Sequence, residues 1–193
     1  MGEPGRGARG MGEVLRVLAE LRGTYDGGEA VDELSHALQC ATLAAEAGAP
    51  AELVAAALLH DVGRHPAIAG SGRATPHQIA GSGRATPHEI AGARWLRPRF
   101  GQKVAWLVMA HVPAKVYLVR DDPTYLSSLS AVSAASLAHQ TGHHPALGRL
   151  AVHPFWEDAL QVRRWDDAAK VPGAPEMGLD EAVGRIAHLV VRC

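Results

Sequence analysis

The adjacent residues His60 and Asp61 are the part of this sequence best suited to metal chemistry. Apolar residues between positions 53 and 60 recur at i, i+3, i+4 and i+7, so His60 shares the buried face of a predicted helix. Asp61 lies about 100° further round that helix, and Gly63 is predicted to end it in the left-handed conformation. A buried imidazole beside a carboxylate is costly unless both are paired, and a metal ion pairs with both. Taken alone, however, a His-Asp pair favours an ordinary core histidine, so a metal site requires further ligands.

Further candidate ligands occur in separate predicted helices. His36 and His111 lie on or beside the buried faces of theirs, His88 begins another, and Asp166 faces inward far downstream. Together with the His-Asp pair they supply four imidazoles and two carboxylates, and helical bundles build metal sites in their cores from such groups. Zinc sites are usually four-coordinate, so six nitrogen and oxygen ligands fit two metal ions better, with the aspartate of the pair as a bridge. Mixed imidazole and carboxylate ligation suits iron or manganese.

These ligands need a helical framework, and the spacing of the apolar residues predicts one. Helices are expected over about 14–21, 30–47, 51–61, 90–97, 100–111, 154–166 and 179–191, with one or two more between 123 and 140. Pro98 is predicted to interrupt the helical pattern and Pro113 to end it, with residues 117–122 as a connection. The β-branched residues follow helical spacing, so the fold class is predicted to be all-α, as a single helical bundle.

The chain is expected to form one domain over residues 13–193, preceded by a flexible tail. Residues 1–12 are rich in Gly and Arg, which is typical of such a tail. The segment 68–78 recurs at 79–89 with one difference, and this duplicated loop at 68–89 is too short for a repeat fold. The duplication places the same residues before His77 and His88. His88 is the predicted ligand, because Glu89 and a helix follow it.

Composition excludes several classes of partner. The chain has 193 residues and a formal net charge of -1, so neither nucleic acid nor an anionic membrane is indicated as a partner. No apolar run approaches the roughly 18 to 20 residues that span a bilayer, and the N-terminus lacks the apolar stretch of a signal peptide. Only Cys40 and Cys193 are present, so no disulfide framework is expected and the predicted location is cytoplasmic.

The ligand pattern resembles that of the HD-domain superfamily, in which a histidine, a His-Asp pair and a distant aspartate bind metal. Longer motifs narrow the resemblance to the oxygen-dependent HD enzymes that degrade phosphonates, over about residues 25–172. That resemblance implies a di-iron dioxygenase, an oxidoreductase that uses O2 to split the C–P bond of 2-amino- or 2-trimethylamino-1-hydroxyethylphosphonate into phosphate and a carboxylic acid. The motifs are His36-Ala-Leu-Gln-Cys-Ala41, Ala56-Ala-Leu-Leu-His-Asp61, His88-Glu89, His111-Val-Pro-Ala-Lys115 and Arg163-Arg-Trp-Asp-Asp-Ala-Ala-Lys170.

The same resemblance assigns roles to individual residues around a mixed-valence Fe(II)/Fe(III) pair. It implies catalytic roles for the His-Asp pair and for Lys115, with Asp61 bridging the two irons. Lys115 also contributes to phosphonate binding, Glu29 pairs with a substrate ammonium, and Tyr25 covers the open iron position. The implied ligands are His36, His60, Asp61 and Asp166 for one iron and Asp61, His88 and His111 for the other, and the implied phosphonate-binding residues are Lys115, Ser133 and Arg163.

Alternatives remain open at this point. Arg163 and Lys170 flank Asp166 at helical spacing, which is equally typical of a salt-bridge cluster on a helix surface. The ligands assigned to the first iron, His36, His60, Asp61 and Asp166, would alone satisfy an HD phosphohydrolase acting on a phosphate ester or nucleotide. A third alternative is a degenerate HD module that binds a phosphorylated ligand without reaction. Three features depart from the family pattern: Arg64 replaces a histidine, one extra residue separates Tyr25 from Glu29, and the stretch 140–143 differs from a Gln-Gly-Gly-Pro turn.

Overall fold

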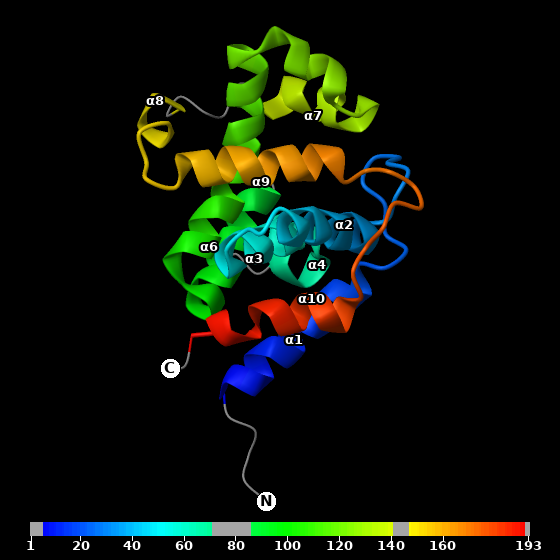
Figure 1. Ribbon diagram of the computed structural model, residues 1–193, viewed down its shortest axis with the longest axis vertical. Coiled ribbons are helices and arrows are strands. Elements are labelled where there is room, and N and C mark those ends of the chain that lie inside the picture. Colours follow the sequence, from blue (N-terminus) through cyan, green and yellow to red (C-terminus); the bar gives the residue numbers. More distant parts are fainter. Residues whose placement is uncertain (1–5, 71–85, 141–146, 192–193) are drawn as a thin grey trace, which may run out of the picture.

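The structure, a computed structural model, describes residues 6–70, 86–140 and 147–191 (Figure 1). Every regular element in these ranges is helical, which confirms the predicted all-α class. The elements are α1 (Arg6–Glu20), α2 (Glu33–Glu46), α3 (Ala51–Leu59), η1 (Val62–Arg64), α4 (Pro66–Ala69), α6 (His88–Asp121), η2 (Pro123–Ser128), α7 (Ala131–Gln140), α8 (Leu147–Leu150), α9 (Trp156–Ala168), α10 (Leu179–Ile186) and η4 (Ala187–Leu189).

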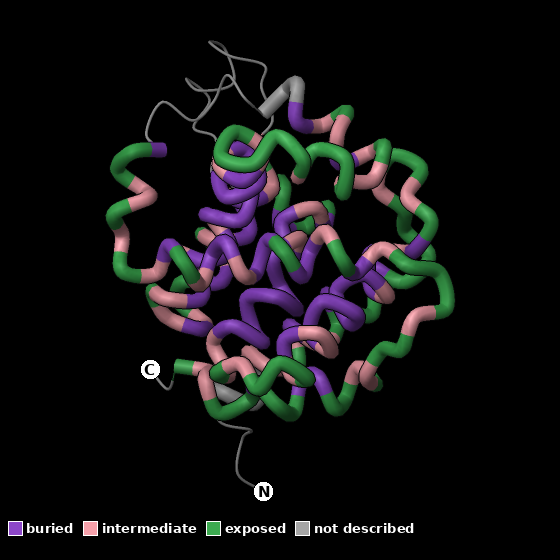
Figure 2. Tube along the Cα trace, turned by 45° about the horizontal axis from the view of Figure 1, so that its top comes forward, coloured by how far each residue is buried: buried purple, intermediate pink, exposed green. Residues whose placement is uncertain are grey.

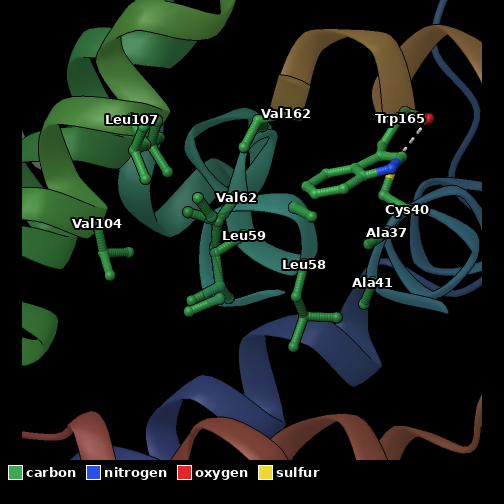
Figure 3. Close-up of a cluster of buried hydrophobic side chains, with 14 of the residues drawn as sticks. Ala37, Cys40, Ala41, Leu58, Leu59, Val62, Val104, Leu107, Val162 and Trp165 are labelled. Carbon is green, nitrogen blue, oxygen red and sulfur yellow. Dashed lines mark hydrogen bonds between the residues drawn. The ribbon is translucent and has the colours of Figure 1, made fainter. Parts of the chain in front are cut away.

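Helix α3 lies at the centre of the bundle. It packs against α2, α6, α9 and α10, and the buried residues gather around it in the middle of the molecule (Figure 2). All residues from Leu53 to Leu59 are buried, so this helix has no solvent-facing side after its first turn. Figure 3 shows Leu58, Leu59 and Val62 among side chains from α2, α6 and α9. A helix with apolar residues on every side is stable only in such a core, and its C-terminal end therefore brings His60 inside the protein.

A side-chain cap fixes the start of helix α2. The Asp32 carboxylate accepts a hydrogen bond from the Ser35 amide at 2.8 Å, which caps the helix. Because this cap fixes the first turn, His36 projects inward from a defined position, and the imidazole is 5% exposed. The predicted start near residue 30 was therefore three residues too early.

Helix α6 corrects the proline-based predictions. It continues through both Pro98 and Pro113, and it includes residues 117–121 that were expected to connect two helices. Its kink lies at Gly101, where φ is 80° and ψ is -172°. Only glycine adopts such a conformation readily, so the break falls there and not at Pro98. An interior proline costs about 3 kcal/mol, but burial of α6 against α3 and α9 offsets that cost at Pro113.

The N-terminus and the duplicated segment also differ in part from expectation. Helix α1 begins at Arg6, so residues 6–12 are helical although they were expected in a flexible tail, and residues 1–5 lie outside the described residues. Of the duplicated loop, only residues 68–70 and 86–89 are described, so His77 and the looping-out of the extra copy are not. Helix α6 begins at His88, as the choice of that histidine requires. The division into one domain over 13–193 stays a prediction.

Candidate metal centre

One cluster of predicted ligands joins α2, the end of α3 and α9. The Nε2 atoms of His36 and His60 lie 3.1 Å apart. Asp166 Oδ1 lies 3.2 Å from His36 Nε2 and 3.6 Å from His60 Nε2, and Asp61 Oδ2 lies 3.4 Å from His60 Nε2. Four ligand atoms from separate elements therefore converge on one buried point.

The second cluster joins η1 to the two parts of α6. The Nε2 atoms of His88 and His111 lie 3.2 Å apart. Asp61 Oδ1 lies 3.0 Å from His88 Nε2 and 3.6 Å from His111 Nε2. Asp61 thus directs one carboxylate oxygen to each cluster, which is the arrangement expected of a bridging ligand. The six residues predicted as ligands are all brought together.

Hydrogen bonds at the far side of three of the four rings hold their orientation. His36 Nδ1 donates to the Ala169 carbonyl at 2.9 Å, His60 Nδ1 to the Ala57 carbonyl at 2.9 Å, and His111 Nδ1 to the Val108 carbonyl at 2.6 Å. A carbonyl oxygen can only accept, so Nδ1 carries a hydrogen in these rings and Nε2 is the nitrogen available to a metal ion. Histidines that bind metals are held by their second nitrogen in this way.

The charges of the site also fit metal ions. Burial would raise the pKa of Asp61 and Asp166, but Arg64 and His60 outweigh it at Asp61, and Arg163 and His60 at Asp166, so both pKa values lie well below the usual range. Burial would lower the pKa of His60, but Asp61 and Asp166 raise it to about 10, so the site attracts positive charge.

Two further observations favour metal ligation. Asp61 Oδ1 is buried and has no hydrogen-bond partner among the described residues. In addition, the Nε2 atoms of each histidine pair lie only about 3 Å apart, a spacing at which a proton or a metal ion must lie between them. The buried Cys40 Sγ lies 3.9 Å from both nitrogens of His36, and together with His36 and His60 it forms a group that could hold a metal ion.

Gly63 has a role that the sequence prediction assigned wrongly. It was expected to end a helix in the left-handed conformation, but it lies in η1 and has no positive φ. A Cβ atom at this position would stand 1.9 Å from the His88 carbonyl oxygen and 2.6 Å from the Gly92 amide nitrogen. Glycine is required because the first turn of α6 packs directly on the backbone here. This close approach brings His88 beside Asp61.

A cationic wall faces the metal ligands across a narrow cavity. Lys115 and Arg163 line it and are 2% and 3% exposed. Lys115 Nζ donates to the Ser133 carbonyl at 3.2 Å and to Ser136 Oγ at 2.7 Å, and Arg163 donates to Ser133 Oγ at 3.1 Å. Burial, and then repulsion from Arg163, lowers the pKa of Lys115 to about 8. The three predicted phosphonate-binding residues therefore meet, and Ser136, which was not predicted, joins them.

Arg163 is not part of a solvated surface cluster. It pairs with Asp166 Oδ2 at 2.7 Å and also with Asp167, all in the interior of the protein. Asp167 in turn accepts a hydrogen bond from the Tyr125 hydroxyl at 2.6 Å. The arginine therefore connects a predicted metal ligand to the anion-binding wall, and the surface salt-bridge interpretation is wrong for it.

Glu29 and Tyr25 occupy different positions from those of the other predicted site residues. Glu29 lines the cavity, but its carboxylate already pairs with Lys170 Nζ at 3.2 Å and accepts from Ser130 Oγ at 2.7 Å. Tyr25 is 60% exposed. It lines neither the cavity beside Lys115 nor a second cavity next to His36 and Asp61. A separate hollow of about 250 Å³ lies along α6 and is lined by groups such as Trp106 and Met109, none of them a predicted ligand.

Comparison with known proteins agrees with this geometry. The family model of the HD domain matches residues 34–130, and the chain belongs to the HD-domain family. Within it, the chain is 37% identical over 177 residues to hydroxymethylphosphonate dioxygenase of Gimesia maris, covering 88% of this chain and 85% of the relative. It is 34% identical over 145 residues to [1-hydroxy-2-(trimethylamino)ethyl]phosphonate dioxygenase (glycine-betaine-forming) of Leisingera caerulea, covering 74% and 71%. An uncharacterized protein of Acanthamoeba polyphaga mimivirus is 27% identical over 166 residues, covering 82% and 71%.

The resemblance to the phosphonate-degrading HD oxygenases is thereby confirmed. In the part of the chain that the structure describes, no helix is long and apolar enough to cross a membrane. Two residues beside the predicted site residues were not identified from the sequence. Ser136 contacts Lys115, and Glu33 lines a small cavity next to His36 and Asp61. Ser136 lies one turn after Ser133 on the same helix, so helical spacing was an available signal, whereas Glu33 was hidden among the acidic residues that precede His36.

Proposed function

We propose that this protein is a di-iron dioxygenase that cleaves the C–P bond of a 1-hydroxyalkylphosphonate with O2, yielding phosphate and a carboxylic acid. The observation that carries the proposal is the pairing of a two-cluster His/Asp site with a buried cationic wall in one cavity. A dianionic phosphonate requires such charged hydrogen-bond donors. The names of the two dioxygenase relatives support the same chemistry.

The ligand set supports two metal positions. We assign His36, His60, Asp61 and Asp166 to one iron, and Asp61, His88 and His111 to the other, in a mixed-valence Fe(II)/Fe(III) pair. Imidazole and carboxylate ligands suit iron. When bound, the iron pair supplies the redox chemistry with O2 that no side chain of the cavity can provide.

The residues of this chain then bind and orient the substrate. Lys115, Arg163 and the Ser133 hydroxyl hold the phosphonate oxygens, which places C1 and its hydroxyl toward the ligands of the opposite wall. The burial of these donors excludes water from the phosphonate and strengthens each contact. For hydroxymethylphosphonate the products are formate and phosphate, the C–P bond and one C–H bond are broken, and each product gains one oxygen atom from O2.

The surroundings of Glu29 favour a compact substrate over one with a cationic group at C2. Because Lys170 already neutralises this carboxylate, a trimethylammonium or ammonium group would have to displace an existing ion pair. Hydroxymethylphosphonate carries no such group. The 2-amino- and 2-trimethylamino-1-hydroxyethylphosphonates stay candidates in the same reaction class.

The alternative function is a metal-dependent phosphohydrolase. It needs only the first cluster, so the second cluster formed by Asp61, His88 and His111 favours the oxygenase. Purified protein loaded with iron should contain about two irons per chain and consume one O2 for each phosphate released from hydroxymethylphosphonate. Phosphate release from phosphate esters under anaerobic conditions, with no O2 uptake on any hydroxyphosphonate, would establish the hydrolase instead.

A further inference from the structure

Arg64 stands three residues after Asp61 and ends η1. Its Nε lies 3.1 Å from Asp61 Oδ2 and 3.9 Å from Glu33 Oε1, and its Nη1 lies 2.9 Å from Asp26 Oδ2. The guanidinium group borders the same cavity as Lys115, yet all three ion pairs are with carboxylates. Its contacts therefore indicate a partner for acidic groups of this protein and not an additional phosphonate ligand.

The positive charge of Arg64 lies beside three carboxylates, those of Asp26, Glu33 and Asp61. Burial raises the pKa of Glu33 to about 7, with a further contribution from Asp61, while Arg64 opposes the rise. The guanidinium group faces Asp61 Oδ2 and leaves Oδ1 to the two histidines of the second cluster. Removing the positive charge would leave Asp61 and Glu33 to repel each other in the interior, so the carboxylate of Asp61 would lose the contact that sets its orientation.

Asp26 connects this pair to the loop between α1 and α2. The loop turns tightly, because the Glu29 amide donates to the Asp26 carbonyl at 2.8 Å and Gly27 and Gly28 have φ values of 55° and 95°. Asp26 and Glu29 both line the cavity. The loop is thus tied at one end to Arg64 and at the other, through Glu29, to Lys170.

We propose that Arg64 is a positioning residue that orients the bridging carboxylate of Asp61 and couples it to the loop 24–30. Through the chain Asp26–Arg64–Asp61, metal binding sets the position of the loop, and the loop in turn stabilises the metal-bound orientation of Asp61. This inference rests on the proposed two-metal site. It explains why an arginine, whose extended charged group lies beside two carboxylates at once, occupies this position.

The test compares Arg64→Gln, Asp26→Asn, the double variant and the control Arg22→Gln. Arg22 also pairs with acidic residues, Asp32 just before α2 and Glu176 just before α10, but none of its ion pairs involves Asp61. Fe2+ is titrated anaerobically into each protein, and hydrogen exchange of residues 24–33 is followed by mass spectrometry with and without metal.

Loss of Arg64 should weaken apparent Fe2+ affinity about tenfold, as is common when a residue behind a metal ligand is removed. Asp26→Asn should weaken it about threefold, in keeping with a partly exposed ion pair. The double variant should match Arg64→Gln, because Asp26 acts through the arginine. Metal should slow exchange in the loop of the wild-type protein and of Arg22→Gln, but not in Arg64→Gln or Asp26→Asn.

Unchanged Fe2+ affinity in Arg64→Gln, or metal-dependent protection of the loop that survives in it, would overturn the coupling while leaving the two-metal site intact. A wild-type protein that binds no Fe2+ would overturn both. If Arg64→Gln does not fold, the Fe2+ affinity and loop exchange of Asp26→Asn test the coupling instead. Asp26 suits this purpose because it has no other ion pair among the described residues. Neither readout depends on turnover of a phosphonate, so failure of the oxygenase proposal is recognised separately.

Discussion

Replacing Lys115 by Met should stabilise the protein while damaging its activity. The lysine is 2% exposed, and burial lowers the pKa from 10.5 to about 8. That difference corresponds to about 3 kcal/mol of unfavourable free energy for keeping the ammonium charged in the folded protein, at 1.36 kcal/mol for each tenfold change in proton affinity. Methionine has a similar shape and carries no charge. Ser136 still donates to the Ser133 carbonyl at 2.9 Å, so loss of the lysine leaves that carbonyl partnered.

After about 1 kcal/mol is deducted for the lost hydrogen bonds, the variant should gain about 2 kcal/mol of unfolding free energy at pH 7. For a chain of this size the melting temperature should rise by about 4–8 °C. The direction of the Lys115 pKa shift also predicts how the stability gain depends on pH. The unfolded lysine binds its proton more tightly than the folded one, so the gain is complete below about pH 8 and disappears as the pH rises toward 10.5.

Thermal unfolding of metal-free protein at pH 7 and pH 10 measures this difference, with Lys103→Met as the control. Lys103 is on the same helix and pairs with Asp158 near the surface. Activity on hydroxymethylphosphonate should fall about 10- to 100-fold in kcat/KM, since a charged hydrogen bond to the phosphonate is lost. A variant that melts lower than the wild type at pH 7, or that is stabilised equally at both pH values, would refute the reasoning.

Four further outcomes are expected. Asp61→Ala should lose both metal ions, measured as metal per chain, and retention of both would contradict the bridging role. His88→Ala should lose one metal while His77→Ala keeps both, which elemental analysis of the two variants checks. Gly63→Ala should lower the unfolding free energy by about 3 kcal/mol or more, because its Cβ would overlap the backbone of α6; near-normal melting would argue against that packing. The kcat/KM of the wild type should fall about tenfold per pH unit above pH 8 as Lys115 loses its proton, and a flat profile to pH 10 would exclude this role.

Helical periodicity predicted several of the ligands because they lie on or beside the buried faces of their own helices. His36, His60 and His111 were recognised in this way, and the structure brings their rings together. Periodicity carries no information about how the helices are joined in space. The number and type of ligands suggested two metal ions with Asp61 as a bridge, but the assignment of each ligand to one cluster had to come from a resemblance to a known family, and then from the contacts themselves.

The failed predictions share a physical cause. Pro98 and Pro113 were interpreted from local rules, but the packing of α6 against α3 and α9 outweighs the loss of single backbone hydrogen bonds. The ammonium-binding role of Glu29, which the family resemblance implied, stays a prediction, but its pairing with Lys170 joins residues far apart in the chain and was not foreseen. Long-range ion pairs leave no periodic trace in a sequence.

The two clusters exist as one centre because of a residue with no side chain. Gly63 lets the first turn of α6 approach the backbone of η1, and that approach sets His88 Nε2 3.0 Å from Asp61 Oδ1. Any larger residue would move α6 away and separate His88 and His111 from the shared carboxylate. The first cluster would survive such a shift, because its other ligands come from α2, α3 and α9. The glycine two residues after the His-Asp pair is therefore what allows the proposed second metal position to lie beside the first.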